Sequence, residues 1–224
     1  MKAAFFDVDG TLTKHRVWAG LLDYFKENRI RLGRYYFFSL VHYGLYGLHR
    51  LGLVSQVTFR SAWAKNLSWH FAGFTIQQAA DIWEWVIENR LKGQWRTDIV
   101  ELLKKHKRKG TKIFLVSGGP VGLLERIAAE VGGDFAVGTK HQIINGKYTG
   151  RSEGIACQGA NKPLLVKEKI KELGLHIDLD YSYAYADSLA DLQLLTLVGH
   201  PVAVYPDDNL REIALEKGWQ ILED

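Results

Sequence analysis

Short apolar runs that end in polar loops and lead into helices recur along this chain of 224 residues. Runs typical of strands occupy 2–8, 112–116, 181–186 and 202–204. The first reaches DVDGT, the second stops at SGGP and the third stops at Asp187. Helical spacing follows the second and third runs, over 121–131 and 189–198. This alternation predicts an α/β fold with a Rossmann-like parallel sheet, helices on both faces, and ligands at the carboxyl ends of the strands.

Two segments depart from this alternation. The dipeptide Asn145-Gly146 lies between HQII and KYTG and is typical of a two-residue hairpin turn, so we expect a small β-hairpin flap there. The segment 14–95 contains no convincing strand, and its apolar spacing fits several helices. We therefore expect an α-helical cap domain over 14–95, inserted into an α/β core domain formed by 1–13 and 96–224.

Composition narrows the classes of function. Lys and Arg number 29 against 25 Asp and Glu, and a net charge of +4 gives no reason to expect a nucleic-acid partner. Cys157 is the only cysteine, which excludes an intrachain disulfide and favours a reducing, cytoplasmic location. The start of the chain lacks the pattern of a secretory signal. The longest uncharged run, 35–49, is shorter than the roughly 20 residues that a transmembrane helix needs.

Two carboxylates lie two residues apart at the end of the first run. Alternation along a strand directs Asp7 and Asp9 to the same side, and Gly10 and Thr11 then turn the chain. A hard cation such as Mg²⁺ prefers oxygen ligands and would screen the repulsion between the carboxylates, which frees one of them to attack phosphorus. The alternative interpretation is an ordinary turn with a solvated acidic pair.

Further polar groups follow at comparable positions. Ser117 and two glycines precede a helix, where a hydroxyl and backbone N–H groups can bind an anion. Lys162 begins a helical segment and could neutralise phosphate charge. Asp187 and Asp191 follow the third run and could supply a metal ligand and a supporting carboxylate. Each group alone also fits a helix cap or a surface residue, but their shared position at strand and helix ends argues for one site.

In this order the motifs resemble those of the haloacid dehalogenase (HAD) superfamily of phosphohydrolases. FFDVDGTLT is similar to the first motif, LVSGG to the second, Lys162 to the third and YADSLAD to the fourth. The helical insert and the hairpin resemble subfamily IB, the phosphoserine-phosphatase-like group. The fourth motif departs from the Gly-Asp-Gly-x-Asn-Asp form of authentic phosphoserine phosphatases, although its carboxylate is present.

The resemblance implies a Mg²⁺-dependent phosphomonoester hydrolase, a phosphatase that acts through an aspartyl-phosphate. Asp7 would be the nucleophile and Asp9 the general acid and base, with Thr11 helping to orient Asp9. The implied metal ligands are the Asp7 carboxylate, the Asp9 backbone carbonyl and Asp187, with Asp191 as a supporting group near Lys162. The implied phosphate-binding groups are the Gly10 N–H, Ser117, the Gly118 N–H and Lys162. Such groups suit phosphoryl transfer, which needs alignment and charge neutralisation.

The segment after the first motif bears on the substrate. Phosphoserine phosphatases carry a cap glutamate there that pairs with the substrate's amino group, and here the same offset falls on Arg16. Because a guanidinium repels an ammonium, we expect phosphoserine to be a poor substrate and another small phosphorylated metabolite to be the substrate.

Basic and aromatic residues are interspersed over 29–60. Such a pattern can mark an interfacial helix on anionic lipid, and peripheral membrane contact would fit a lipid-phosphate phosphatase of the phosphatidylglycerophosphatase type. We favour the interpretation in which the aromatic side chains form the core of the cap and the arginines are solvated. The aromatic residues concerned are Tyr35, Tyr36, Phe37, Phe38, Tyr43 and Tyr46. Further alternatives are a non-catalytic phosphate-binding module and a phosphotransferase that excludes water.

Overall fold

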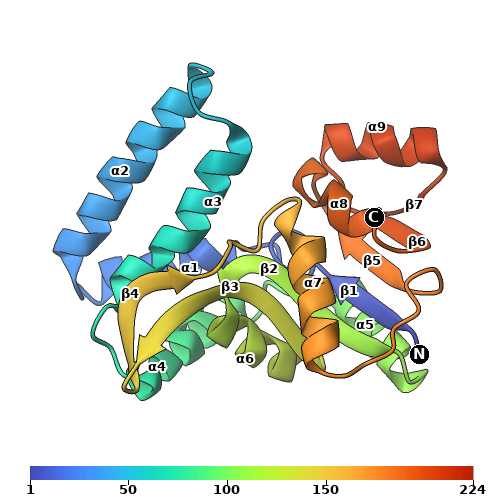
Figure 1. Ribbon diagram of the computed structural model, residues 1–224, viewed down its shortest axis with the longest axis horizontal. Coiled ribbons are helices and arrows are strands. Elements are labelled where there is room, and N and C mark those ends of the chain that lie inside the picture. The colour runs from blue at the N-terminus through green and yellow to red at the C-terminus, as the bar shows by residue number, and fades with distance from the viewer. Residues whose placement is uncertain (224) are drawn as a thin grey trace.

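A seven-stranded sheet forms the centre of the computed structural model, which describes residues 1–223 (Figure 1). The strand order is β4-β3-β2-β1-β5-β6-β7. The strands are β1 (Ala3–Phe6), β2 (Lys112–Pro120), β3 (Phe135–Ile144), β4 (Lys147–Glu153), β5 (Tyr183–Ala186), β6 (His200–Val204) and β7 (Gln220–Leu222). Strand β4 pairs antiparallel with β3, and the other neighbours pair in parallel. The predicted α/β fold is confirmed.

Helices connect the strands and cover the sheet. The α-helices are α1 (Val17–Glu27), α2 (Leu32–Arg50), α3 (Gln56–Asn66), α4 (Ile76–Val86), α5 (Thr97–Arg108), α6 (Val121–Val131), α7 (Asn161–Glu172), α8 (Leu192–Leu195) and α9 (Asp208–Lys217). Short 3₁₀ segments lie at η1 (Leu67–Phe71) and η3 (Leu189–Asp191), and a π segment at η2 (Ile87–Leu91).

Strand β1 shows why the sheet needs helices on both faces. Its four residues are apolar and fully buried. Ala4 and Phe6 belong to one apolar cluster, whereas Ala3 and Phe5 belong to a second cluster on the opposite face. Because successive side chains of a strand alternate between faces, a strand with no polar residue must be covered on both sides.

The structure corrects two predicted boundaries. Strand β2 continues through the predicted loop at SGGP, since pairing with β3 resumes at Pro120 after an irregularity that begins at Val116. The hydroxyl of Thr139 donates to the Gly118 carbonyl at 2.8 Å and holds this stretch in place. The predicted helix over 189–198 is instead the short pair η3 and α8, which ends at Leu195. Helix α9 and strand β7 had not been predicted.

The predicted hairpin is confirmed, but it is no separate flap. Asn145 and Gly146 both have positive φ angles, 50° and 72°, as a two-residue hairpin turn requires. The first half of β3 pairs in parallel with β2 in the central sheet, beginning with Phe135 opposite Phe114, and only its second half pairs with β4. The hairpin is therefore an extension of the main sheet.

The segment between β1 and α5 is helical, and the described residues 14–95 form no strand beyond isolated bridges. Helices α1 and α4 pack beside the sheet, where one apolar cluster joins Phe6 of β1 to Leu21 and Trp83 of the insert. Helices α2 and α3 project from the rest of the molecule as a two-helix arm, residues 32–66, which we call the α2–α3 arm (Figure 1). The division into cap and core domains stays a prediction.

The aromatic residues of α2 do not all form a core, so that prediction was wrong for most of them. Phe38 is fully buried and Tyr35 is half-buried. The exposed fractions are 61% for Tyr36, 57% for Phe37, 70% for Tyr43 and 44% for Tyr46. Helix α2 packs against α3 on one side, so most side chains that point away from α3 stay exposed, although the Phe37 ring lies 5.6 Å from the ring of Trp69. None of the described helices is long and apolar enough to cross a bilayer.

Candidate active site

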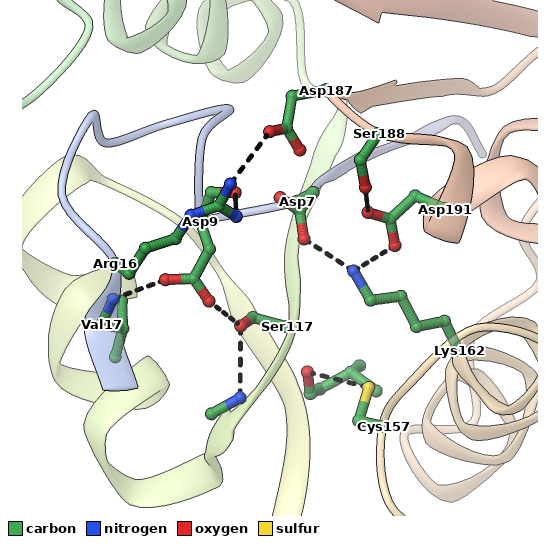
Figure 2. Close-up of polar contacts among 12 residues, drawn as sticks. Asp7, Asp9, Arg16, Val17, Ser117, Cys157, Lys162, Asp187, Ser188 and Asp191 are labelled. Carbon is green, nitrogen blue, oxygen red and sulfur yellow. Dashed lines mark hydrogen bonds and ion pairs between the residues drawn. The ribbon is translucent and has the colours of Figure 1, made fainter. Parts of the chain in front are cut away.

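Asp7 and Lys162 form the centre of the site (Figure 2). Asp7 directly follows β1, and Lys162 is the second residue of α7. The Nζ atom of Lys162 lies 2.6 Å from Asp7 Oδ1 and 2.5 Å from Asp191 Oδ1. Burial alone would lower the pKa of Lys162, but Asp191 and Asp7 outweigh it and raise that pKa. The lysine is therefore a permanent buried cation shared by two carboxylates.

The Asp7 carboxylate has one occupied and one free oxygen. Oδ1 accepts from Lys162, whereas the buried Oδ2 has no hydrogen-bond partner among the described residues. Burial raises the pKa of Asp7 well above its ordinary value, and Lys162 opposes this rise. An unpartnered buried carboxylate oxygen is costly unless a cation or a ligand meets it.

Asp187 and Asp191 complete a group of three carboxylates. Asp187 follows β5 directly and Asp191 ends η3, so both lie with Asp7 at the carboxyl edge of the sheet. Each of the three offers an oxygen within 4.8 Å of the others. Burial raises the pKa of Asp187 to about 6, although Arg16 lowers it. The three carboxylates repel one another, and the neighbouring cations Lys162 and Arg16 offset only part of their negative charge.

The side chain of Asp9 points away from this group (Figure 2). Its Oδ1 accepts from the Val17 N–H at 2.5 Å, and its Oδ2 accepts from the Ser117 hydroxyl at 3.1 Å. Burial raises the pKa of Asp9, and these two donors oppose the rise. Thr11 is buried nearby, but its hydroxyl has no hydrogen-bond partner among the described residues. Val17 and Ser117, rather than Thr11, therefore hold the Asp9 carboxylate.

Two glycines permit close approaches at the site. A Cβ atom at Gly10, whose φ is +99°, would lie 2.0 Å from Asp187 Oδ2. A Cβ atom at Gly118 would lie 1.8 Å from Gln158 Nε2. Both positions therefore require glycine for the neighbouring polar side chain to reach the site.

Arg16 lies beside two of the predicted metal ligands. Its Nη1 donates to the Asp9 backbone carbonyl at 2.9 Å, and its Nη2 lies 4.0 Å from Asp187 Oδ2. The side chain is about half exposed. In this structure the guanidinium thus supplies positive charge at the same oxygens that the sequence analysis assigned to a cation.

The site fits a divalent cation. Asp7, Asp9, Asp187 and Asp191 provide four carboxylates, against which Lys162 and Arg16 provide two positive charges. The carboxylates of Asp7 and Asp187 are hard donors of the kind that Mg²⁺ prefers, and the unpartnered Asp7 Oδ2 shows that this carboxylate is not saturated by hydrogen bonds. Asp191 belongs to the same group of three carboxylates, and its Oδ1 also contacts Lys162.

A cavity of about 700 Å³ extends from these carboxylates towards the α2–α3 arm. Its inner end is formed by Asp7, Asp9, Ser117, Gly118, Lys162 and Asp187. Its outer wall is largely aromatic and includes Trp18, Tyr35, Tyr43, Tyr46, Phe59 and Trp63. Arg16 and Arg60 are the charged residues that the arm and α1 region contribute to its lining.

Several contributors to the cavity had not been predicted, among them Trp18, Phe59 and Trp63 of its wall. Gln158 lines the cavity next to Gly118, and the loop 205–207 lines it from the end of β6. The backbone N–H of Asp207 donates to the Asp187 carbonyl at 2.8 Å. The loop follows a predicted strand, so the rule that ligands gather at strand carboxyl ends would have found it. Gln158 carried no comparable signal.

This fold and site define a hydrolase of the phosphohydrolase type. A candidate nucleophilic aspartate, a lysine that contacts two carboxylates, and a cluster of three aspartates lie together at one edge of the sheet. The family model of haloacid dehalogenase-like hydrolases matches residues 4–196. The chain belongs to that family.

One curated relative is the Mycobacterium tuberculosis (strain ATCC 25618 / H37Rv) protein named phosphoserine phosphatase SerB1, which is 30% identical over 228 residues, 98% of this chain and 70% of the relative. A crystal structure of a protein of unknown function from Bordetella pertussis Tohama I has a TM-score of 0.81 at 23% identity, covering 99% of this chain and 98% of the other. A substrate-bound phosphoserine phosphatase structure has a TM-score of 0.63 at 19% identity, covering 100% and 93%. The chain is a phosphomonoester hydrolase of this family.

Proposed function

We propose that this phosphatase is Mg²⁺-dependent and acts through an aspartyl-phosphate on Asp7. The observation that carries the proposal is the Asp7 carboxylate, whose Oδ1 is held by Lys162 at 2.6 Å while its buried Oδ2 is free. A nucleophile needs one oxygen fixed for orientation and the other available for attack. Asp7 is one of the residues that line the cavity, so a substrate phosphate can reach it there.

In the first step, Asp7 Oδ2 forms a bond to phosphorus while the bond from phosphorus to the leaving oxygen breaks. Asp9 donates its proton to that oxygen, a role favoured by the burial that raises its pKa. In the second step, Asp9 takes a proton from water, the water oxygen bonds to phosphorus, and the bond to Asp7 breaks. Lys162, Ser117 and the Gly118 N–H would hold the phosphoryl oxygens in both steps.

The groups proposed to hold Mg²⁺ are the Asp7 carboxylate, the Asp9 backbone carbonyl and Asp187, with Asp191 in support. When bound, the ion would neutralise negative charge on the phosphoryl oxygens. Arg16 would leave the Asp9 carbonyl, which is feasible because its side chain is about half exposed.

We further propose that the substrate is a small phosphorylated metabolite other than phosphoserine, although one relative is named phosphoserine phosphatase. Among the described residues, the segment 16–66 contributes Arg16 and Arg60 but no carboxylate to the lining of the cavity. An ammonium group held at this side of the cavity would therefore meet positive charge and no carboxylate. The aromatic wall favours a leaving group with apolar surface.

A screen of phosphomonoesters with and without Mg²⁺ tests these proposals, with Asp7→Asn as the inactive control. We expect turnover that requires Mg²⁺, is lost in Asp7→Asn, and is low for phosphoserine. Trapping of the denatured enzyme's acyl phosphate with hydroxylamine should label Asp7. Turnover without metal would refute the dependence on Mg²⁺, and labelling of another residue would refute the aspartyl-phosphate on Asp7. Phosphoserine as one of the best substrates would refute the proposed substrate class. Activity retained by Asp7→Asn would refute the nucleophile, and transfer to an added alcohol in preference to water would indicate a phosphotransferase.

A lipid phosphate is the second candidate substrate. The observation that favours it is the aromatic outer wall, which places Tyr43, Tyr46 and Phe59 of the projecting arm along the cavity. Acyl chains could follow this wall. Comparison of a short-chain lipid phosphate with its water-soluble headgroup phosphate distinguishes the candidates, since only a lipid phosphatase gains in kcat/KM from the chains.

A further inference from the structure

The outward side of α2 is an exposed apolar face. The residues Tyr36, Phe37, Leu40, Tyr43, Leu48 and Leu51 have exposed fractions of 61%, 57%, 74%, 70%, 42% and 75%. We call these six residues the outer face. Exposed large apolar side chains are ordinary when scattered, but a contiguous group on one element marks an interaction surface.

Helical spacing explains why the outer face is continuous. At 3.6 residues per turn, positions 36, 37, 40, 43 and 48 of α2 fall within one arc of about 140°, and Leu51 caps the end of the helix. Phe38 and His42 point the opposite way, are fully buried, and pack against Trp63 of α3 at centroid distances of 5.2 Å for both rings. The inward side of α2 therefore packs against α3. The outer face stays largely exposed, although the Phe37 ring lies 5.6 Å from the ring of Trp69 in η1.

The charge around the outer face has one sign. The sequence contains no Asp or Glu from residue 28 to residue 80, whereas it contains six basic residues there. These are Arg29, Arg31, Arg34, Arg50, Arg60 and Lys65. Arg34 and Arg50 lie near the two ends of α2 and are exposed. An apolar face flanked by cations, in a stretch of the sequence without acidic residues, is complementary to a surface that is apolar inside and anionic at its boundary.

We propose that the outer face of α2 docks on the surface of an anionic lipid bilayer. The aromatic and leucine side chains would enter the headgroup and upper acyl region, and the arginines would lie at the phosphate level. A second copy of this chain fits less well, because two such faces would bring like charges together with no acid to pair them. This proposal goes beyond the catalytic activity and does not depend on it.

Docking in this orientation has a consequence for the cavity. Tyr43 belongs to the outer face and also lines the cavity. The cavity therefore opens beside the surface that would meet the bilayer, so a docked enzyme could take phosphorylated molecules from the membrane as well as from solution.

Vesicle co-sedimentation of the full chain tests the proposal. Vesicles of phosphatidylcholine with an equal amount of phosphatidylglycerol are compared with vesicles of phosphatidylcholine alone, at low and high salt. We expect binding to the anionic vesicles that weakens with salt. Leu40→Asp should lower the partition coefficient about tenfold or more, because the leucine contribution is lost and a repelled charge is added. Arg50→Gln should lower it by a smaller factor.

Leu215→Asp is the matched control, because Leu215 is 69% exposed on α9, away from the arm in Figure 1, and should leave binding unchanged. Circular dichroism and hydrolysis of a soluble aryl phosphate check that each variant folds. Absence of wild-type binding to anionic vesicles, or equal binding of Leu40→Asp and wild type, overturns the proposal. A dimeric mass in light scattering that Leu40→Asp abolishes, without vesicle binding, would assign the face to a second copy and would also overturn it. Failure of catalysis with intact vesicle binding would affect only the proposed function.

Discussion

The Nζ atom of Lys162 lies 2.6 Å from the Oδ1 atom of Asp7, although 155 positions separate the two residues along the chain. The pair is almost completely buried, and Asp191 shares the same ammonium. The Lys162 ammonium offsets negative charge on Asp7 and Asp191, whereas the nearest cation to Asp187 among the ion pairs of the described residues is Arg16 at 4.0 Å.

Replacement of Lys162 should destabilise the protein strongly. Lys162→Met leaves Asp7 and Asp191 buried beside each other without a counter-charge, and removal of one partner of a buried pair costs about 3–5 kcal/mol. Urea denaturation measures this loss. The double variant Lys162→Met/Asp191→Asn should recover part of it. Lys169→Met is the control on the same helix, because its pair with Glu172 is more exposed and contributes at most about 1 kcal/mol. Equal losses for the two single variants would contradict the role assigned to Lys162.

Replacement of Asp187 should stabilise the metal-free protein. Burial raises the pKa of Asp187 to about 6 from 3.8, so the folded state binds the proton more tightly than the unfolded state does. This carboxyl is therefore most favourable to folding below pH 4, and the advantage is lost as pH rises to about 6. In EDTA at pH 7.5, Asp187→Asn should raise Tm by a few degrees, and by less at pH 5. A Tm of Asp187→Asn below that of the wild type at both pH values would show that burial of the Asp187 carboxylate does not destabilise the folded protein.

Magnesium binding should weaken below about pH 6, because the ligand oxygen of Asp187 must lose its proton before it can meet the cation. We expect the dissociation constant for Mg²⁺ to be nearly constant above this pH and to rise by up to about tenfold for each unit below it. Calorimetric titration between pH 5 and pH 8 measures the dependence. In Asp187→Asn binding should be weak at every pH, and a wild-type profile that stays flat down to pH 5 would be inconsistent with this ligand.

Removal of Arg16 should strengthen cation binding. The guanidinium donates to the Asp9 carbonyl at 2.9 Å and lies 4.0 Å from Asp187, so a cation must displace it. For a half-exposed pair this competition is worth about 0.2–1 kcal/mol, or up to about fivefold in affinity. Titration of Arg16→Ala with Mn²⁺, followed by electron paramagnetic resonance, measures the change. Arg60→Ala lines the same cavity and serves as the control. Weaker binding by Arg16→Ala than by Arg60→Ala would show that Arg16 supports the metal site.

Replacement of Asp9 should affect substrates unequally. Asp9→Asn cannot give a proton to the leaving oxygen, and general acid catalysis contributes about 10²- to 10⁴-fold. An alkyl phosphate, whose leaving alkoxide is strongly basic, should lose this factor in kcat. An aryl phosphate such as p-nitrophenyl phosphate needs little protonation and should lose much less. Equal losses on both substrates would indicate that Asp9 acts only through its backbone carbonyl.

Local patterns in the sequence were sufficient to predict several elements. Strands β1, β2, β5 and β6, helix α7 and the hairpin turn at Asn145-Gly146 follow from short apolar runs, helical spacing and turn chemistry, which act between neighbouring residues. The stretches that carry Asp7, Ser117 and Asp187 were predicted to meet because parallel strands place their carboxyl ends at one edge. Lys162, at the start of a predicted helix, was assigned to the same site from the order of the motifs. The roles of these residues stay predictions.

Contacts between distant segments were needed for the rest. Whether an aromatic residue of α2 is buried like Phe38 or exposed like Tyr43 depends on which side of the helix α3 covers. The approach of Arg16 to the Asp9 carbonyl depends on how α1 leaves the loop after β1, and that of Gln158 to Gly118 on where α7 docks. Periodicity specifies which residues share a face, but burial and electrostatic pairing depend on what that face meets, and this is set by packing across the whole chain.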